Sequence, residues 1–428
     1  MKRQKEKKIN NPNTIFIQIA SYRDPQLLLT IEDMLSKAKY PENLRIGICW
    51  QHSQNDKWPD IDKYKTDDRF RILDIPHKES KGVCWARNKV QQLYKDEKYT
   101  MQLDSHHRFV QDWDDILINM LEDLIKDGYA KPLLTSYIPS FDPDNDPAAR
   151  VQEPWKMNFD RFIPEGAVFF LPASFDSWDD KTKPLPARFY SAHFAFTLGS
   201  FCHEVPHDPD YYFHGEEISI AVRAYTHGYD LFHPHKVVCW HEYTRKGRTK
   251  QWDDDPVWAD RNNKCHLRNR KLFEMDGEKR DIDFGPYGFG TTRTLRDYEK
   301  YSGLCFGKRA IQQRVQDHKA PPDPLTSHVS DEEFDASLMR IFKHCIDIQY
   351  NQVPEKDYEF WVVAFHDKDD NTIYRKDADI HEINRMKNDP DGYCKVWREC
   401  SVSENPKYWV VWPYSKSKGW CERITGNL

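Results

Sequence analysis

Apolar residues follow two different periods in the first third of the chain. Short apolar runs, typical of buried strands, occupy residues 14–20, 44–50, 69–75 and 99–103. Between them, apolar residues recur every three or four positions, which predicts helices over 25–39, 82–94 and 113–126. Strands that alternate with helices in this way predict an α/β fold, with a mostly parallel sheet and helices on both faces.

The pattern becomes irregular beyond residue 130. Residues 131–186 are rich in proline, which predicts long, ordered loops over the end of the sheet. A strand at 192–200 and a helix at 215–227 follow, and residues 231–238 return the chain to the sheet. Residues 247–296 are rich in charge and glycine, which predicts loops and short helices.

The C-terminal quarter has a pattern of its own. It predicts a helix over 332–350 and strands over 358–366, 372–374, 408–414 and 420–424. The segment before it, 320–327, has the sequence APPDPLTS, which is typical of a linker. We therefore divide the chain into a flexible basic tail (1–13), an α/β domain (14–319), a linker (320–330) and a small β-rich C-terminal module (331–428) of unassigned role.

Composition narrows the class of protein. The chain of 428 residues is 31% charged, but it is also 14% aromatic, and disordered chains are poor in aromatic residues. The net charge of −6 disfavours a nucleic-acid-binding protein. No apolar run approaches the roughly 18 residues of a membrane span. No apolar segment follows the basic N-terminus, so we expect no secretory signal. Without a secretory signal, the ten cysteines are expected to be reduced thiols, and the lack of a CxxC pair disfavours structural zinc.

The strongest local motif is Asp104-Ser105-His106, directly after the apolar run 99–103. Ligands of open α/β sheets bind at the carboxyl ends of strands. A carboxylate and an imidazole at this place suit a divalent metal such as Mn²⁺, although an ordinary surface turn remains an alternative. The same spacing recurs at Asp379-Ile380-His381, but no apolar strand precedes that copy. We expect the second copy to be solvated surface.

Three further signals carry candidate chemistry. A helix that opens at Gly82 places Arg87 near its start, which suits a diphosphate, or is an ordinary surface helix. Glu216 and Glu217 open another helix, where they are either simple caps or acids that orient an acceptor. His241 ends a strand, and a lone histidine in that position is more often structural.

Taken in order along the chain, these signals resemble the retaining GT-A glycosyltransferases. They are similar to the polypeptide N-acetylgalactosaminyltransferases, whose metal motif is Asp-Ser-His after a strand. The stretches IASYRDPQL, DSHHRF and HGEEISIAVRAYTHGYDLFHP more closely resemble the cytoplasmic hydroxyproline N-acetylglucosaminyltransferases, which modify an adaptor subunit of a ubiquitin ligase. The likeness covers roughly residues 14–300. It departs at Phe213 and His214, where the related motif has tryptophan and glycine.

The resemblance implies a GT-A fold and a metal-dependent enzyme with a cytoplasmic location, which fits the expected absence of a secretory signal. It implies transfer of α-GlcNAc from UDP-GlcNAc to a protein hydroxyl, of hydroxyproline or of serine and threonine, with retention of configuration. Asp104, His106 and His241 would hold the cation, Mn²⁺ in the first place and Mg²⁺ as the alternative. Glu216 and Asp104 would be catalytic, with Glu216 orienting a hydroxyl. The residues expected to bind the donor are Ser21, Tyr22, Arg23, Arg87 and Glu217.

Three other functions compete with this interpretation. Two histidines and one carboxylate also describe a non-haem iron oxygenase, although such sites usually occur on all-β folds. A degenerate transferase could bind a sugar nucleotide or a protein without catalysis. An inverting transferase of the polysaccharide-synthase type would carry a Gln-x-x-Arg-Trp signature, which this chain lacks.

Overall fold

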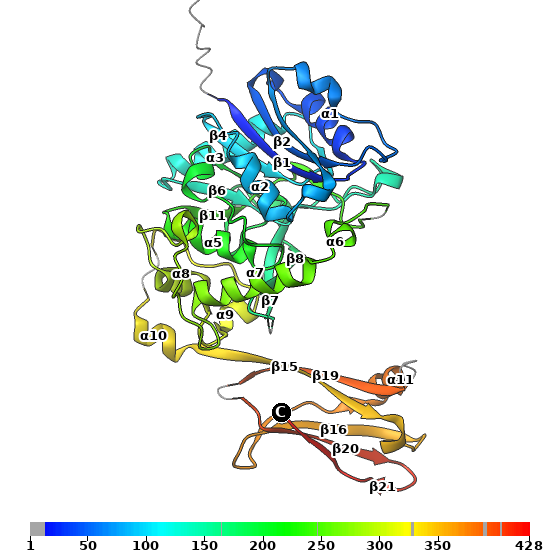
Figure 1. Ribbon diagram of the computed structural model, residues 1–428. Helices are drawn as coiled ribbons and strands as arrows, with labels where there is room; N and C mark the ends of the chain where they lie inside the picture. The colour runs from blue at the N-terminus through cyan, green and yellow to red at the C-terminus, as the bar shows by residue number, and fades with distance from the viewer. Residues whose placement is uncertain (1–12, 164, 246, 327–328, 388–391, 403–404) are drawn as a thin grey trace, which may run out of the picture. The chain divides into compact units, whose positions relative to one another are not determined.

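The computed structural model describes residues 13–163, 165–245, 247–326, 329–387, 392–402 and 405–428. The predicted tail therefore lies outside the described residues, except for residue 13. Internal contacts divide the chain into two units (Figure 1). The first comprises the described residues up to Gly307 together with Arg314–Asp331. The second comprises Lys308–Gln313 and Glu332–Leu428.

The first unit is built on an eight-stranded sheet of order β3-β2-β1-β4-β10-β6-β11-β9. Its strands run in the same direction except for β10 and β9, which are antiparallel to their neighbours. The bounds of these strands are β1 Ile15–Tyr22, β2 Leu44–His52, β3 Phe70–Pro76, β4 Tyr99–Leu103, β6 Pro132–Thr135, β9 Leu185–Pro186, β10 Phe194–Leu198 and β11 Asp230–His233.

Helices cover both faces of this sheet. Side chains alternate along a strand, and Ile17 and Ile19 of β1 accordingly share a core with α1 and α3, whereas Phe16 packs with α2 and α4. The helices are α1 Leu27–Lys37, α2 Val83–Gln91, α3 Trp113–Lys126, α4 Phe201–Glu204 and α5 Glu216–Thr226. The predicted α/β class, with a mostly parallel sheet between two layers of helices, is confirmed.

The prediction of loops throughout residues 131–186 is wrong. Besides β6 and β9, this segment forms a two-stranded ribbon from β7 (Trp155–Phe162) and β8 (Val168–Ser174). Met157 and Phe159 of β7 are buried. The proline content predicted loops because proline has no N–H for a strand ladder. A two-stranded ribbon has only edge strands, and these tolerate proline.

The prediction of loops and short helices over 247–296 is also partly wrong. This segment contains α6 (Gln251–Asp254), the 16-residue α7 (Trp258–Phe273) and the start of α8 (Leu295–Ser302). The buried face of α7 includes His266 and Asn269 beside Cys265 and Leu272. Because polar residues occupy part of the buried face, apolar residues do not recur at helical spacing in this segment, and the sequence did not predict the helix. The other short strands before residue 308 are β5 His107–Phe109, β12 Cys239–His241 and β13 Leu304–Cys305.

The second unit is β-rich, as predicted. Strands β14 (Ala310–Gln312), β15 (Leu338–Gln349) and β19 (Tyr393–Val402) pair in that order. A second sheet runs β17-β16-β20-β21, with β18 beside β16 and β22 beside β20. Its strands are β16 Tyr358–His366, β17 Thr372–Arg375, β18 Ala378–Asp379, β20 Tyr408–Ser415, β21 Gly419–Trp420 and β22 Ile424–Asn427. The helices α9 Gln313–Gln316, α10 Asp331–Ala336 and α11 Ile380–Lys387 complete the chain.

The predicted helix over 332–350 is wrong. Only α10 is helical there, and β15 occupies most of the segment. Ile346 and Ile348 are buried while Asp347 is exposed, which is the alternation of a strand with one covered face. Their burial depends on β19, which pairs with β15 in antiparallel register from Arg340 to Gln349. The sequence analysis did not predict β19.

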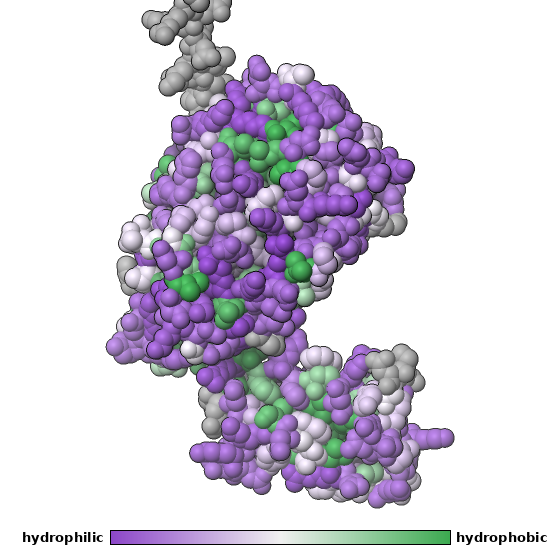
Figure 2. Space-filling view, viewed as in Figure 1, coloured by the Kyte–Doolittle hydropathy of each residue, from purple (hydrophilic) through white to green (hydrophobic). Residues whose placement is uncertain are grey.

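The surface agrees with the polar composition. Most of the face seen in Figure 2 is hydrophilic, with apolar residues in separate small patches. Asp379, Ile380 and His381 are exposed at the start of α11, as predicted for the second Asp-x-His copy. The carboxylate of Asp379 accepts a hydrogen bond from the backbone N–H of Glu382. None of the described helices combines the length and the apolar character that crossing a membrane would require.

Candidate active site

The Asp104-Ser105-His106 turn leaves the sheet at the carboxyl end of β4. The side chain of Thr30 in α1 holds the backbone of this turn by hydrogen bonds. Its hydroxyl donates to the carbonyl oxygen of Ser105 at 3.0 Å and accepts from the N–H of His107 at 2.9 Å. The helix packed on the sheet therefore holds the backbone of the motif, so that the side chains of Asp104 and His106 can act from a rigid base.

His241 reaches the same turn through strand pairing. Strands β5 and β12 are antiparallel, and their register sets His241 opposite His107. Nε2 of His241 then lies 3.5 Å from Oδ2 of Asp104, and Nε2 of His106 lies 3.8 Å from the same oxygen. One ligand atom from each of the three residues lies within 4.8 Å of the others. The three residues predicted as metal ligands thus converge on one point.

The protonation of these groups suits a divalent cation. Burial opposes ionisation of Asp104, but His241, Arg87 and His106 outweigh it and hold the pKa of this carboxyl well below its usual range. Burial also keeps the pKa of His241 well below its usual value, so the imidazole is neutral. Neither ring nitrogen of His241 makes a hydrogen bond within the described part of the chain. A neutral imidazole without a hydrogen-bond partner beside a carboxylate fits a metal ligand.

Arg87 connects this cluster to a second one. Its buried guanidinium donates from Nη2 to Oδ1 of Asp104 at 2.8 Å and from Nη1 to Oε1 of Glu216 at 3.4 Å. Burial acts against the charge of Arg87, but the two carboxylates raise its pKa. The sequence analysis placed Arg87 on a diphosphate, whereas in the structure its hydrogen bonds go to carboxylates. The diphosphate contact stays a prediction.

Glu216 and Glu217 open α5, directly after Gly215. Gly215 has a φ of 98°, and a Cβ there would lie 3.1 Å from the side chain of Asn269, so both conformation and space favour glycine. Burial, followed by repulsion from Glu217, raises the pKa of Glu216. Burial likewise raises the pKa of Glu217, whose carboxylate accepts hydrogen bonds from the Ala192 N–H at 2.8 Å and the Tyr137 hydroxyl at 3.2 Å. Two buried acids with raised pKa values are typical of functional sites.

The two clusters face a common pocket of about 460 Å³. Its lining includes Asp104 and His241 from the first cluster and Glu216 and Glu217 from the second. Aromatic rings form much of the remainder, including Phe169 and Phe170 of β8 together with Tyr137, His193, Phe213 and Tyr243. A pocket of this size with polar groups set in an aromatic wall suits one small organic ligand. Sequence reasoning missed the β8 aromatics because they lie in the segment expected to be loops.

Ser21 and Tyr22 end β1, the strand beside β4, where they pair with β2, and Arg23 follows them. The Tyr22 hydroxyl donates to Asp254 at 2.7 Å, and Arg23 contacts Asp254 at 3.0 Å and Asp56 at 2.8 Å. The carbonyl oxygen of Ser21 accepts a hydrogen bond from Gln51. The structure places all three at the predicted edge of the sheet, and their part in binding a donor remains a prediction.

A buried network that the sequence analysis did not find surrounds His106. Asp24 accepts hydrogen bonds from Ser105 Oγ and His106 Nδ1, each at 2.7 Å, and contacts Arg248 at 3.2 Å. Nη1 of Arg248 also lies 2.9 Å from Nε2 and 2.5 Å from Nδ1 of His106, and its Nη2 lies 2.8 Å from Glu242. The only signal in the sequence is proximity, since Asp24 follows Arg23 and Glu242 follows His241.

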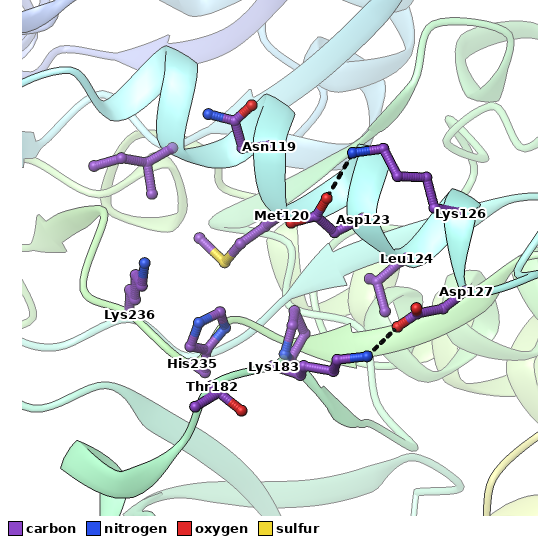
Figure 3. Close-up of a pocket in the computed structure, with 12 residues that line it drawn as sticks. Asn119, Met120, Asp123, Leu124, Lys126, Asp127, Thr182, Lys183, His235 and Lys236 are labelled. Carbon is purple, nitrogen blue, oxygen red and sulfur yellow. Dashed lines mark hydrogen bonds and ion pairs between the residues drawn. The ribbon is translucent and has the colours of Figure 1, made fainter.

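A second hollow of about 320 Å³ lies beside α3 (Figure 3). Residues of α3, of the segment 182–184 and of the segment 235–236 line it, and Lys183 pairs with Asp127 at 2.7 Å on its rim. Its lining contains none of the predicted site residues. The pocket at the strand ends is therefore the candidate active site.

A family of known proteins matches the first unit of the chain in sequence. Residues 14–68 and 61–308 match the family described as Glycosyltransferase (GlcNAc), so the matched region contains every predicted site residue. Among curated proteins, none matches the chain in sequence. Many solved structures resemble the chain, and three of them, all at low sequence identity, follow.

The first is GalNAc-T7 with UDP, GalNAc and Mn²⁺, with 10% identity, coverage of 96% of this chain and 69% of that chain, and a TM-score of 0.47. The second is residues 1–349 of S. aureus TarS, with 10% identity, coverage of 72% and 83%, and a TM-score of 0.36. The third is the mannosyltransferase PcManGT from Pyrobaculum calidifontis with GDP-Man and Mn²⁺, with 12% identity, coverage of 68% and 70%, and a TM-score of 0.38.

Proposed function

The chain belongs to the glycosyltransferase (GlcNAc) family, and from this premise we propose that it transfers GlcNAc from UDP-GlcNAc to a protein hydroxyl, with retention of configuration. One observation carries the proposal. Asp104 and His241 line one pocket at the carboxyl end of β4 together with the acid pair Glu216 and Glu217. His106 completes the triad, because a ligand atom of each of the three residues lies within 4.8 Å of the others. Ligands of open α/β sheets bind at this edge.

The triad would hold a divalent cation, Mn²⁺ in the first place. When bound, such a cation neutralises the negative charge that develops on departing UDP. The protein's part is to fix the ligand atoms. Arg87 binds Oδ1 of Asp104 and so leaves Oδ2 directed at the two histidines. The neutral His241 contributes a free lone pair.

The acid pair would act on the other reactant. Glu216 lies in the pocket with a raised pKa, which allows its carboxyl group to hold a sugar or acceptor hydroxyl by hydrogen bonds. Glu217 is engaged by Ala192 and Tyr137, so its expected role is to shape the donor side of the pocket. In a retaining transfer the acceptor hydroxyl approaches on the face that UDP leaves, and its proton passes to the departing phosphate. Such a transfer requires no strong base from the protein.

The acceptor and the location follow from the resemblance noted above. We propose hydroxyproline of a cytoplasmic protein as the acceptor, an adaptor subunit of a ubiquitin ligase being the first example to test. Serine or threonine hydroxyls are the alternative. The C-terminal module, residues 331–428, is proposed as a separate unit outside the catalytic domain 14–319.

UDP release tests this function directly. Purified protein is incubated with a panel of UDP-sugars and Mn²⁺, with EDTA and the His106→Ala variant as controls. We expect slow hydrolysis of UDP-GlcNAc that both controls abolish. Binding of UDP and metal without turnover of any donor, with or without an acceptor peptide, would instead support a non-catalytic binding module. Failure to bind UDP would contradict the proposal.

A further inference from the structure

Asp24 is a buried carboxylate that contacts a predicted metal ligand and has no predicted role of its own. It is 5% exposed and lies just after β1, beside the end of β4. Its Oδ2 accepts a hydrogen bond from Nδ1 of His106 at 2.7 Å and another from Ser105 Oγ at 2.7 Å. Its Oδ1 accepts from the backbone N–H of Gln26 at 2.8 Å. Both oxygens are therefore held in place.

The hydrogen bond between Asp24 and His106 decides which ring nitrogen of His106 carries the proton. A neutral histidine carries one ring proton, and it binds a cation through the other nitrogen. An ionised carboxylate can only accept, and an arginine can only donate. Of the two groups that contact Nδ1, only Asp24 can therefore take a hydrogen bond from it. A proton on Nδ1 leaves the lone pair on Nε2, the nitrogen that lies 3.8 Å from Oδ2 of Asp104.

We propose that Asp24 is a positioning residue, which fixes the tautomer and the ring orientation of His106 so that Nε2 is presented to the cation. The proposal rests on the proposed function for the identity of the group that Nε2 meets. Its effect on His106 does not depend on sugar transfer. Carboxylates that hold the second nitrogen of a metal-binding histidine commonly strengthen metal affinity 10–100-fold.

The surrounding backbone keeps Asp24 where it can act. Arg23 adopts a φ of 44°, which turns the chain out of β1 and directs Asp24 back toward the sheet edge. Thr30, from the helix that follows, holds the backbone on both sides of His106. The carboxylate is thus bound by Gln26, the residue that precedes α1, and the backbone beside His106 is bound by Thr30 within α1, so moving either side of the contact breaks hydrogen bonds.

Asp24→Asn tests the proposal, because asparagine keeps the shape and removes the charge. Mn²⁺ binding to the full chain, followed by electron paramagnetic resonance, is expected to weaken about 10–100-fold. The ¹⁵N shifts of His106 in metal-free protein are expected to change from a pure Nδ1–H form to a mixture of tautomers. Asp24→Glu, which restores a carboxylate, is expected to recover the Nδ1–H form at least in part.

Asp114→Asn is the matched control. Asp114 is 1% exposed and accepts hydrogen bonds from the backbone N–H groups of Lys39 and Tyr40, outside the candidate site. It should change stability but neither Mn²⁺ affinity nor the His106 spectrum. Wild-type affinity with an unchanged tautomer in Asp24→Asn would overturn the proposal, and so would equal losses in both variants. If the wild-type protein binds no Mn²⁺, the proposed metal-dependent function fails, and the ¹⁵N spectra still decide whether Asp24 sets the tautomer.

Discussion

Arg87 donates a hydrogen bond to Oδ1 of Asp104 at 2.8 Å, on the side of the carboxylate away from the two histidines. The same guanidinium reaches Glu216 at 3.4 Å. Asp104 belongs to the proposed metal site and Glu216 to the proposed acceptor side. One buried side chain therefore links the two halves of the pocket, and its positive charge compensates the ionised Asp104 and favours the ionised form of Glu216.

Arg87→Met removes the positive charge between Asp104 and Glu216 and keeps a side chain of similar size, so it tests what the charge contributes. Methionine fills similar space but leaves two carboxylates without their shared cation, which is costly for buried charges. We expect a loss of UDP-GlcNAc turnover of about 100-fold or more, comparable to the loss of a group that orients a catalytic residue. Donor turnover measured beside a thermal melt would check this. A variant that melts normally and turns over normally would contradict the bridging role.

The two Asp-x-His copies offer a matched pair of substitutions. His106→Ala removes an imidazole from the convergent triad, whereas His381→Ala removes one from the exposed start of α11 in the second unit. Mn²⁺-dependent UDP release should disappear in the first variant and stay at the wild-type level in the second. Strong loss in His381→Ala would show that the functional copy had been misidentified.

The fold could be predicted wherever burial follows a local period. The strands at 44–50 and 99–103 were predicted closely because nearly all of their side chains are buried, and the helix at 113–126 because its buried residues recur on one face. The strand β15 was not, because its pattern is regular only near Ile346 and Ile348 and its partner lies some 50 residues downstream. The long helix α7 was missed because His266 and Asn269 take buried positions that usually carry apolar residues.

In the candidate site too, residues were predicted where a local pattern marks them and missed where distant contacts set their role. Asp104 and His106 were found from a motif next to a strand. His241 could be added only through a family resemblance, because the pairing of β5 with β12 that sets it in place is not visible in the sequence. Asp24 and Arg248 were missed altogether, since their role arises from contact with His106 across more than 80 residues of chain.

Arg248 competes with a cation for His106. Its Nη1 lies 2.9 Å from Nε2, the nitrogen that a metal would use, and it adds a positive charge to the site. We expect Arg248→Gln to strengthen Mn²⁺ binding severalfold in the absence of nucleotide. The gain should shrink as salt is raised, because the charge contribution is screened. Titrations at two ionic strengths would check this, and unchanged or weaker binding at low salt would show that Arg248 instead supports the site.

Glu216→Gln should lower donor turnover and raise the stability of the folded protein at neutral and alkaline pH. Burial raises the pKa of Glu216 above its ordinary value of 4.5, so the folded protein holds this proton more tightly than the unfolded chain does. As the pH rises from that ordinary value toward the raised one, the unfolded chain ionises this acid while the folded protein keeps it protonated, so the free energy of unfolding falls. Glutamine has no proton to lose, so the variant should escape this fall.

Thermal melts between about pH 5 and pH 8 would measure the difference, which should be small at the acid end and grow toward the alkaline end. Donor turnover by Glu216→Gln should fall at the same time, because the amide cannot hold a hydroxyl as a carboxyl group does. Glu122→Gln is the control, since hydrogen bonds from Lys98 and Tyr99 lower the pKa of Glu122. Its wild-type contribution to stability is present above the ordinary pKa and lost as the pH falls, so this variant should lose stability at neutral pH. If the melting temperatures of the two variants change with pH in the same way, burial does not raise the pKa of Glu216.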